Sequence, residues 1–164
     1  MTDALQLIDF VHLSDNEKRM VLEWRNHPNV KEWMYTSDNI ALEAHLSFID
    51  SLKHRSDKRY FVVKNDKDYL GVIDFYNIID DSCEFGLYVN PFAHTRGIGK
   101  ELLTQSILYA FNALNVQTLV LEVFCNNTKA IHLYEKYGFT PVGTKTFNKN
   151  EIIIMELKHE NRTV

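Results

Sequence analysis

Two glycines, Gly97 and Gly99, mark the junction between an extended segment and a helix, and this junction constrains the chain most. The extended segment covers residues 85–89, and apolar residues at helical spacing follow from 102 to 111. Glycine lacks a Cβ, so backbone N–H groups at these positions can approach a ligand closely. A helix start also leaves its first amides unpaired and carries the positive end of the helix dipole. The junction therefore predicts a phosphate-binding site.

The familiar nucleotide loops do not match this junction. A P-loop requires Gly-Lys followed by Ser or Thr, whereas Gly99-Lys100 is followed by Glu101. The dinucleotide fingerprint requires three spaced glycines near a first strand, and this pair lies past the middle of the chain. Taken alone, the pair is equally typical of a helix start softened by glycine.

Length, charge and cysteine content limit the class of protein. The 164 residues suit one domain, residues 1–164, and the net charge of −4 disfavours a nucleic-acid partner. Cys83 and Cys125 form no disulfide framework and show no metal-ligand spacing with histidines, so we expect a reducing compartment and no metal. The first residues lack a basic segment followed by an apolar run, and no apolar run reaches the ~20 residues of a membrane span. We therefore expect a cytoplasmic protein without a membrane partner.

The hydrophobic pattern predicts an α+β fold, with a mixed sheet and helices on both faces. A capping box of Ser14 and Glu17 predicts the first helix, which Pro28 ends by disfavouring helix at the residue before it. The expected strands cover residues 5–11, 60–63, 70–76, 83–89, 118–123, 139–142 and 152–157. Further helices are expected around 30–34 and over 41–52, 98–114 and 128–137.

A second motif follows the buried segment 118–123. It places Asn127, Ala130 and Tyr134 on one face of a helix that ends at Gly138. By itself this pattern indicates only an amphipathic helix.

Together the two motifs resemble those of the GNAT acetyltransferase superfamily. The first resembles its pyrophosphate loop, Gln/Arg-x-x-Gly-x-Gly/Ala, with His94 where Gln or Arg is usual. The second resembles Asn-x-x-Ala-x-x-x-Tyr-Glu-Lys-x-Gly-Phe, and the two occur in the family's order. The resemblance implies the GNAT fold, with a mostly antiparallel sheet, and acetyl-CoA as co-substrate. It implies that the co-substrate is held by Leu87, Tyr88, Val89, His94, Thr95, Arg96, Gly97, Ile98, Gly99, Lys100, Asn127, Ala130 and Tyr134.

The expected reaction is direct attack of an amine on the thioester carbonyl. Tyr134 would point at the sulfur and, with an ordinary pKa of ~10, would be protonated and able to act as general acid. Backbone N–H groups of the strand before the loop would stabilise the oxyanion. Glu84 shares a strand face with Ser82 and Gly86, so it is the candidate base, acting directly or through water, and Ser82 would orient the amine or a water. A solvated strand carboxylate is the other interpretation of Glu84.

The acceptor is indicated by the first half of the chain. The stretches 24–28, 33–35, 44–49, 71–75 and 82–88 resemble one GNAT subgroup. That subgroup acetylates UDP-4-amino-4,6-dideoxy-N-acetyl-β-L-altrosamine, a nucleotide sugar of pseudaminic acid biosynthesis, a pathway linked to flagellin glycosylation. Arg25 could clamp a diphosphate, His45 could donate to a phosphate oxygen or a hydroxyl, and aromatic rings could lie against uracil or sugar. The expected acceptor residues are Arg25, His27, Trp33, Met34, Tyr35, His45, Phe48 and Tyr76.

Other functions remain open at this point. A ribosomal-protein or other N-terminal peptide acetyltransferase is one, and an aminoglycoside or polyamine acetyltransferase is another. The basic groups Arg25, His27 and His45 disfavour a polycationic acceptor. A degenerate domain that binds acetyl-CoA as a regulatory module is the non-enzymatic alternative, which the intact Tyr134 disfavours. A homodimer is the candidate assembly.

Overall fold

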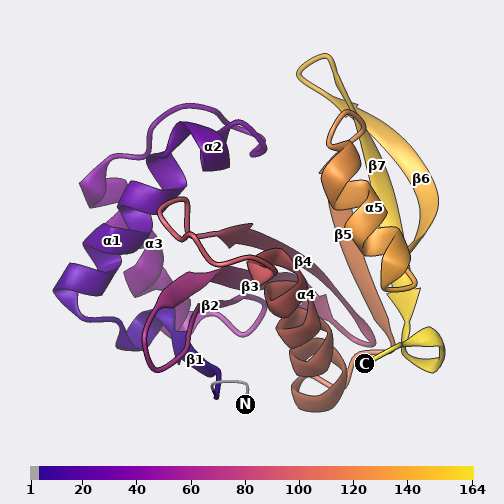
Figure 1. Ribbon diagram of the computed structural model, residues 1–164, viewed down its shortest axis with the longest axis horizontal. Helices are drawn as coiled ribbons and strands as arrows, with labels where there is room; N and C mark the ends of the chain where they lie inside the picture. The colour runs from indigo at the N-terminus through magenta and orange to yellow at the C-terminus, as the bar shows by residue number, and fades with distance from the viewer. Residues whose placement is uncertain (1–3) are drawn as a thin grey trace.

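A seven-stranded mixed sheet runs through the molecule in the order β1-β2-β3-β4-β5-β7-β6 (Figure 1). Neighbouring strands are antiparallel except β4 and β5, which are parallel. This computed structural model describes residues 4–164, so the first three residues of the expected domain, and the N-terminal segment examined for a signal peptide, lie largely outside it. The predicted mostly antiparallel α+β sheet is confirmed.

The elements have the following bounds. The strands are β1 (Gln6–Asp9), β2 (Arg59–Lys64), β3 (Tyr69–Ile79), β4 (Ser82–Val89), β5 (Thr118–Phe124), β6 (Thr140–Phe147) and β7 (Asn150–Lys158). The α-helices are α1 (Asp15–Asn26), α2 (Pro28–Lys31), α3 (Leu42–Ser51), α4 (Ile98–Leu108) and α5 (Thr128–Lys136). The short helical turns are η1 (Phe10–His12), η2 (Leu52–His54), the π-helical η3 (Tyr109–Ala113) and η4 (His159–Asn161).

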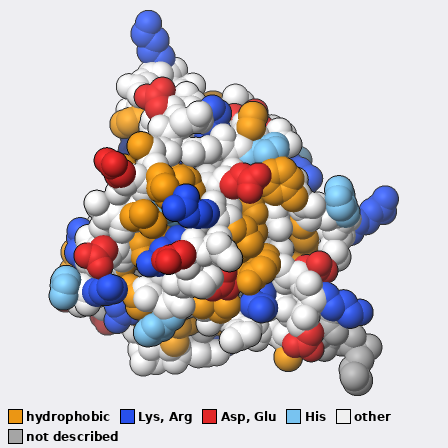
Figure 2. Space-filling model, turned by 90° about the vertical axis from the view of Figure 1, so that its left-hand side faces the viewer, with side chains coloured by type: hydrophobic (Ala, Val, Ile, Leu, Met, Phe, Trp, Pro, Cys, Tyr) orange, Lys and Arg blue, Asp and Glu red, His pale blue; other side chains and the backbone are white. Residues whose placement is uncertain are grey.

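Each face of the sheet has its own hydrophobic core. Helices α1 and α3 pack on one face, where Trp24 and Ile49 meet Val62 and Val72. Helices α4 and α5 cover the other face, over a larger core of which Leu102 is part. Figure 2 views the molecule from the side that carries α1 to α3, and hydrophobic side chains there alternate with basic and acidic ones. The predicted helices on both faces are confirmed.

Helix boundaries follow mainly from local chemistry. The expected capping box forms, since the Ser14 hydroxyl accepts from the Glu17 amide at 3.1 Å and Glu17 accepts from the Ser14 amide at 2.9 Å. The first strand is shorter than predicted because the Asp9 carboxylate accepts from the Val11 amide and turns residues 10–12 into η1. The helix expected around residues 30–34 ends at Lys31, before Trp33 and Met34.

Gly71 sets how closely α4 approaches the sheet. A Cβ at this position would lie 2.3 Å from the Tyr88 carbonyl oxygen and 2.8 Å from Leu102 Cδ1. Only glycine lets β3, β4 and α4 meet at this distance. The contact fixes α4, and with it the glycine pair at its start, against the middle of the sheet.

Within residues 4–164, every helix is too short or too polar to cross a lipid bilayer.

Candidate active site

The two parallel strands separate after a short paired stretch. Strands β4 and β5 are in register only at Ser82, Cys83 and Glu84, opposite residues 118–120. Beyond this point the two halves of the sheet diverge, as Figure 1 shows. A cavity of about 1190 Å³ occupies the opening and is lined by the unpaired parts of both strands, residues 85–89 and 121–124. Backbone groups that a continuous sheet would pair are therefore available to a ligand.

The glycine pair lies at one side of this cavity. Gly97 is the N-cap of α4 in the left-handed region, with φ of 81°, and no side chain caps the helix. A Cβ at Gly97 would meet no atom within 4 Å, and one at Gly99 would meet only Leu133 Cδ2, at 3.8 Å. Gly97, Gly99 and Lys100 line the cavity. The geometry thus leaves the first amides of α4 accessible from the cavity, and phosphate binding there stays a prediction.

The other residues of the predicted loop lie differently. The side chains of His94, Thr95 and Arg96 are exposed and outside the cavity lining, whereas Ile98 is buried at 4% exposure. Ile98 can therefore meet a ligand through its backbone only.

The second motif forms the opposite wall. Asn127 caps α5 by accepting from the Ala130 amide at 3.4 Å, and Asn127, Ala130 and Tyr134 all line the cavity. The ring of Tyr134 packs edge-on against Phe85 and Phe139, at centroid distances of 6.3 Å and 5.8 Å. Burial, followed by the charge of Asp74, raises the pKa of Tyr134 to about 12. The phenol is therefore protonated at neutral pH, as a general acid requires.

Helix α5 also supplies positive charge that the sequence motifs did not indicate. Lys129 and Lys136 line the same cavity, as does His132 between them. These residues are three and four positions apart, so they share one face of the helix that follows the Asn127 cap. This spacing could have indicated them from the sequence.

The predicted acceptor residues come from α1, the segment after α2, α3 and β3. Arg25, Trp33, Met34, Tyr35, His45, Phe48 and Tyr76 all line the cavity. His27 does not: its Nδ1 accepts from the Asn29 amide at 3.1 Å, and its ring packs edge-on against Phe92 at 5.3 Å. The structure therefore gives His27 a capping contact at the start of α2.

Arg25 is the cation in the middle of this acceptor side. Its Nη1 is buried and has no hydrogen-bond partner among the residues described. Burial lowers the pKa of Arg25, and this decrease is partly offset by the nearby Tyr88, Tyr60 and Asp74. A guanidinium nitrogen without a partner is costly in a folded protein, so it is a strong position for an anionic ligand group.

His45 is held in one protonation state. Its Nε2 donates to the Lys18 carbonyl oxygen at 2.8 Å, and burial lowers its pKa. A neutral imidazole that donates through Nε2 offers Nδ1 as an acceptor only. His45 therefore suits a hydroxyl donor better than the phosphate oxygen considered from sequence.

Tyr35 connects the N-terminal half to the C-terminal hairpin. Its hydroxyl donates to Glu122 Oε1 at 2.7 Å, and its ring lies 4.8 Å from that of Phe147. Glu122 also forms an ion pair with Lys145, whose ammonium lies 5.7 Å from the Tyr35 ring centroid. Burial, followed by the contact with Glu122, raises the pKa of Tyr35. One face of the cavity is thereby closed by contacts between residues far apart in sequence.

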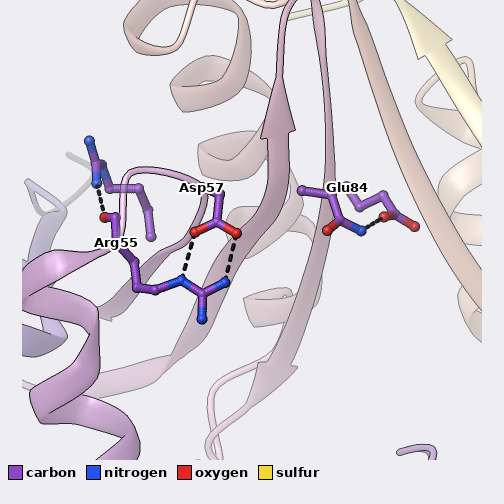
Figure 3. Close-up of polar contacts among 5 residues, drawn as sticks. Arg55, Asp57 and Glu84 are labelled. Carbon is purple, nitrogen blue, oxygen red and sulfur yellow. Dashed lines mark hydrogen bonds and ion pairs between the residues drawn. The ribbon is translucent and has the colours of Figure 1, made fainter.

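Ser82 and Glu84 lie where β4 and β5 are still paired, and neither lines the cavity. Glu84 Oε2 accepts a hydrogen bond from Asn77 Nδ2 (Figure 3). The same view shows Arg55 and Asp57 joined by two hydrogen bonds, of 2.8 Å and 2.7 Å, before β2 begins. Another carboxylate, Asp74 on β3, does line the cavity and was not among the predicted site residues.

In the described part of the chain, no group of three or more His, Cys, Asp or Glu side chains is placed to hold a metal ion.

Comparison with known proteins accounts for this arrangement. The model of the acetyltransferase (GNAT) family matches residues 18–139. The chain belongs to the GNAT acetyltransferase family. It is an acetyl-CoA-dependent N-acetyltransferase, so the expected fold, enzyme class and co-substrate are confirmed.

Two relatives are similar over most of their length. The chain is 43% identical to the acetyltransferase PseH of Campylobacter jejuni over 136 residues, which cover 83% of this chain and 85% of that protein. It is 29% identical to the spermidine N(1)-acetyltransferase of Vibrio cholerae over 137 residues, covering 82% of this chain and 73% of that protein.

Solved structures agree. The crystal structure of Campylobacter jejuni PseH in complex with acetyl coenzyme A matches with a TM-score of 0.78 and 35% identity, over 95% of this chain and 99% of that one. The Vibrio cholerae spermidine N-acetyltransferase, in complex with CoA and spermine, matches with a TM-score of 0.86 at 23% identity, over 96% of each chain. At that identity the second match supports the fold alone. The predicted resemblance to the pseudaminic acid subgroup is confirmed by the PseH matches.

Proposed function

We propose that this enzyme transfers the acetyl group of acetyl-CoA to the 4-amino group of UDP-4-amino-4,6-dideoxy-N-acetyl-β-L-altrosamine, a step of pseudaminic acid biosynthesis. The 43% identity to PseH supports the pathway. The observation that carries the choice of acceptor is Arg25, whose buried Nη1 lacks a partner within residues 4–164 and lies beside aromatic cavity walls. A nucleotide diphosphate offers both the anionic oxygens and the flat ring that such a site would bind.

The donor would bind between α4 and α5. The pyrophosphate would accept from the first amides of α4, and Lys129 and Lys136 would add positive charge. The pantetheine arm would follow the unpaired edge of β4, residues 87–89, toward Asn127 and Tyr134. This arrangement would bring the thioester to the point where β4 and β5 separate.

The chemistry would then proceed in one direct transfer. The acceptor nitrogen forms a bond to the thioester carbonyl carbon, and the developing oxyanion is stabilised by backbone N–H groups of β4. When the C–S bond breaks, Tyr134 donates its proton to the leaving thiolate. Its pKa of about 12 keeps Tyr134 protonated until the C–S bond breaks, so the proton is available to the sulfur at that point.

A polyamine is the second candidate acceptor. The 29% identity to the Vibrio cholerae spermidine N(1)-acetyltransferase favours it, as do the carboxylates of Asp74 and Glu122 in the cavity lining. Glu122 is already paired with Lys145, however, and Arg25 would repel a polycation. A homodimer stays a prediction, and acetylation of a peptide N-terminus is the alternative considered from sequence.

The deciding experiment measures release of free CoA thiol with acetyl-CoA and three acceptors: the UDP-4-amino sugar, spermidine and an N-terminal peptide. The proposal expects turnover of the UDP sugar and competitive inhibition by UDP against that acceptor. Acetylation of spermidine or the peptide alone, without inhibition by UDP, would overturn it.

The variant Arg25→Ala tests the acceptor contact directly. Loss of a charge-assisted hydrogen bond of about 1.5–3 kcal/mol should raise the acceptor KM by roughly 10- to 100-fold and leave the acetyl-CoA KM unchanged. Arg19→Ala, an exposed arginine on the same helix, is the matched control. An acceptor KM that changes equally in both variants would contradict the role of Arg25.

A further inference from the structure

Asp74 is an acidic residue in the middle of β3, between the apolar Ile73 and Phe75. Its chain neighbours Ile73 and Phe75 are fully buried on the opposite face of β3. Across the sheet Asp74 is paired with Tyr60 on β2 and Gly86 on β4, and its side chain lines the cavity. A carboxylate placed there is unusual, because strand interiors disfavour aspartate and partial burial penalises its charge.

Gly86 leaves room for this carboxylate. A Cβ at Gly86 would lie 3.2 Å from Asp74 Oδ1 and 3.4 Å from Oδ2, closer than nearly all real contacts of a Cβ. Gly86 is also the second residue of β4 beyond the last pair with β5. The carboxylate therefore lies over a bare stretch of backbone, at the opening where donor and acceptor would meet.

The protein gives this carboxylate no direct partner. Neither oxygen forms a hydrogen bond or an ion pair with any group of residues 4–164, and the effects on its pKa are burial and more distant charges alone. Burial raises the pKa of Asp74 to about 7, although the charges of Lys58 and Arg25 partly oppose this increase. The titratable and charged groups that act on Asp74 or respond to its charge are Arg25, Lys58, Tyr60, Tyr76, Tyr88 and Tyr134.

We propose that Asp74 is the base of the acetyl transfer: it receives the amine of the acceptor and takes up the proton that the nitrogen loses as the amide bond forms. This proposal deepens the proposed function, on which it rests only for the presence of an amine acceptor. Glu84, the base predicted from sequence, lies on the same face of the sheet as Asp74 and is paired with Tyr76 on β3. Glu84, however, is outside the cavity lining and is bonded to Asn77.

The proton balance of the reaction closes on two residues. The nitrogen lone pair forms the N–C bond, the carbonyl becomes an oxyanion, and its collapse breaks the C–S bond. Asp74 gains the proton from nitrogen while Tyr134 gives one to sulfur, so the products are the amide and free CoA thiol. Transfer of one proton from Asp74 to Tyr134 returns both groups to their starting states. The response of the Tyr134 pKa to the charge of Asp74 indicates that the two groups share one region of the cavity.

The test compares Asp74→Asn with Glu84→Gln in the full-length enzyme, using whichever amine the acceptor panel identifies. Asp66→Asn, in the exposed turn between β2 and β3, is the control. For Asp74→Asn we expect a fall in kcat/KM for the amine of about 100-fold or more at pH 7, with the acetyl-CoA Kd unchanged by calorimetry. The acidic limb of the pH profile, with its midpoint near the Asp74 pKa of about 7, should also disappear.

Three outcomes would overturn the proposal. One is activity of Asp74→Asn within threefold of the unmodified enzyme. Another is a uniform loss with the acidic limb intact, which indicates a structural role. The third is loss of that limb in Glu84→Gln instead. A nucleotide-sugar assignment that fails would be detected in the acceptor panel, whereas a failure of the Asp74 role would be detected in this pH profile.

Discussion

Replacing Asp74 by asparagine should make the protein more stable, and increasingly so as the pH rises. The substitution keeps the shape of the side chain and removes its charge. In the folded protein burial raises the pKa of Asp74 from 3.8 to about 7. At roughly 1.4 kcal/mol per pKa unit, ionising Asp74 in the folded state costs at most about 4 kcal/mol of stability. That value is an upper limit because the carboxylate faces a cavity open to water.

The pH window follows from the two pKa values. Between pH 4 and pH 7 the folded protein holds a proton that the unfolded chain has lost, so stability falls as the pH rises through this range. From pH 5 to pH 8 the unmodified enzyme should lose stability relative to Asp74→Asn, by at most about 2.5 kcal/mol. Above about pH 8 the difference in stability between the two proteins should stay constant, since Asp74 is then ionised in both the folded and the unfolded state.

Urea unfolding at pH 5 and pH 8 measures this difference directly. The urea midpoints of the two proteins should differ more at pH 8 than at pH 5, while the slope of the unfolding free energy against urea concentration stays the same. A constant slope shows that stability, and not compactness, has changed. Asp66→Asn, an exposed turn residue, is the control and should follow the unmodified enzyme. An equal difference in stability between Asp74→Asn and the unmodified enzyme at both pH values would refute the argument that partial burial, with no partner among residues 4–164, raises the pKa of Asp74.

Three further substitutions test other parts of the structure. Gly71→Ala should destabilise the fold by about 3 kcal/mol or more in urea, because its Cβ would lie 2.3 Å from the Tyr88 carbonyl oxygen; a loss below 1 kcal/mol would contradict this packing. Gly99→Val should leave the fold intact yet weaken acetyl-CoA binding about tenfold by calorimetry, and unchanged affinity would exclude these amides as the phosphate site. Tyr134→Phe should bind acetyl-CoA normally and lower kcat by roughly 100-fold, whereas a change of only a few-fold would make Tyr134 a packing residue.

Local signals in the sequence predicted local structure well. The capping box at Ser14, the start of α4 after Gly97 and the Asn127 cap are each decided within four residues of chain. Both cavity walls on the donor side depend on such local features. The glycine pair and the Asn127 motif could therefore be located before the fold was known.

The position proposed for the base could not be predicted in this way. Alternation along β4 correctly put Glu84 on the same face as Gly86, but face alone does not say where two strands separate. That point depends on how many residues of β4 pair with β5, a contact between segments more than 30 residues apart. Asp74 was overlooked for the same reason, although an acid between Ile73 and Phe75 was a visible signal in the strand.

Contacts over long sequence distances account for the other difference. The bond from Tyr35 to Glu122 spans 87 residues, and no local pattern indicates it. His27 also illustrates competition between roles, because a histidine before Pro28 can cap the next helix as readily as it can meet a ligand.

The two tryptophans of the chain lie in contrasting environments, which gives the enzyme an optical probe of its own. Trp24 is 2% exposed in the core, whereas Trp33 is 41% exposed and lines the acceptor side of the cavity. A collisional quencher such as acrylamide should therefore reach the indole of Trp33 and spare that of Trp24. An acceptor that covers Trp33 would shield its emission, while a donor bound between α4 and α5 would leave it accessible. Intrinsic fluorescence can thus distinguish the order in which the two substrates bind, without any attached label.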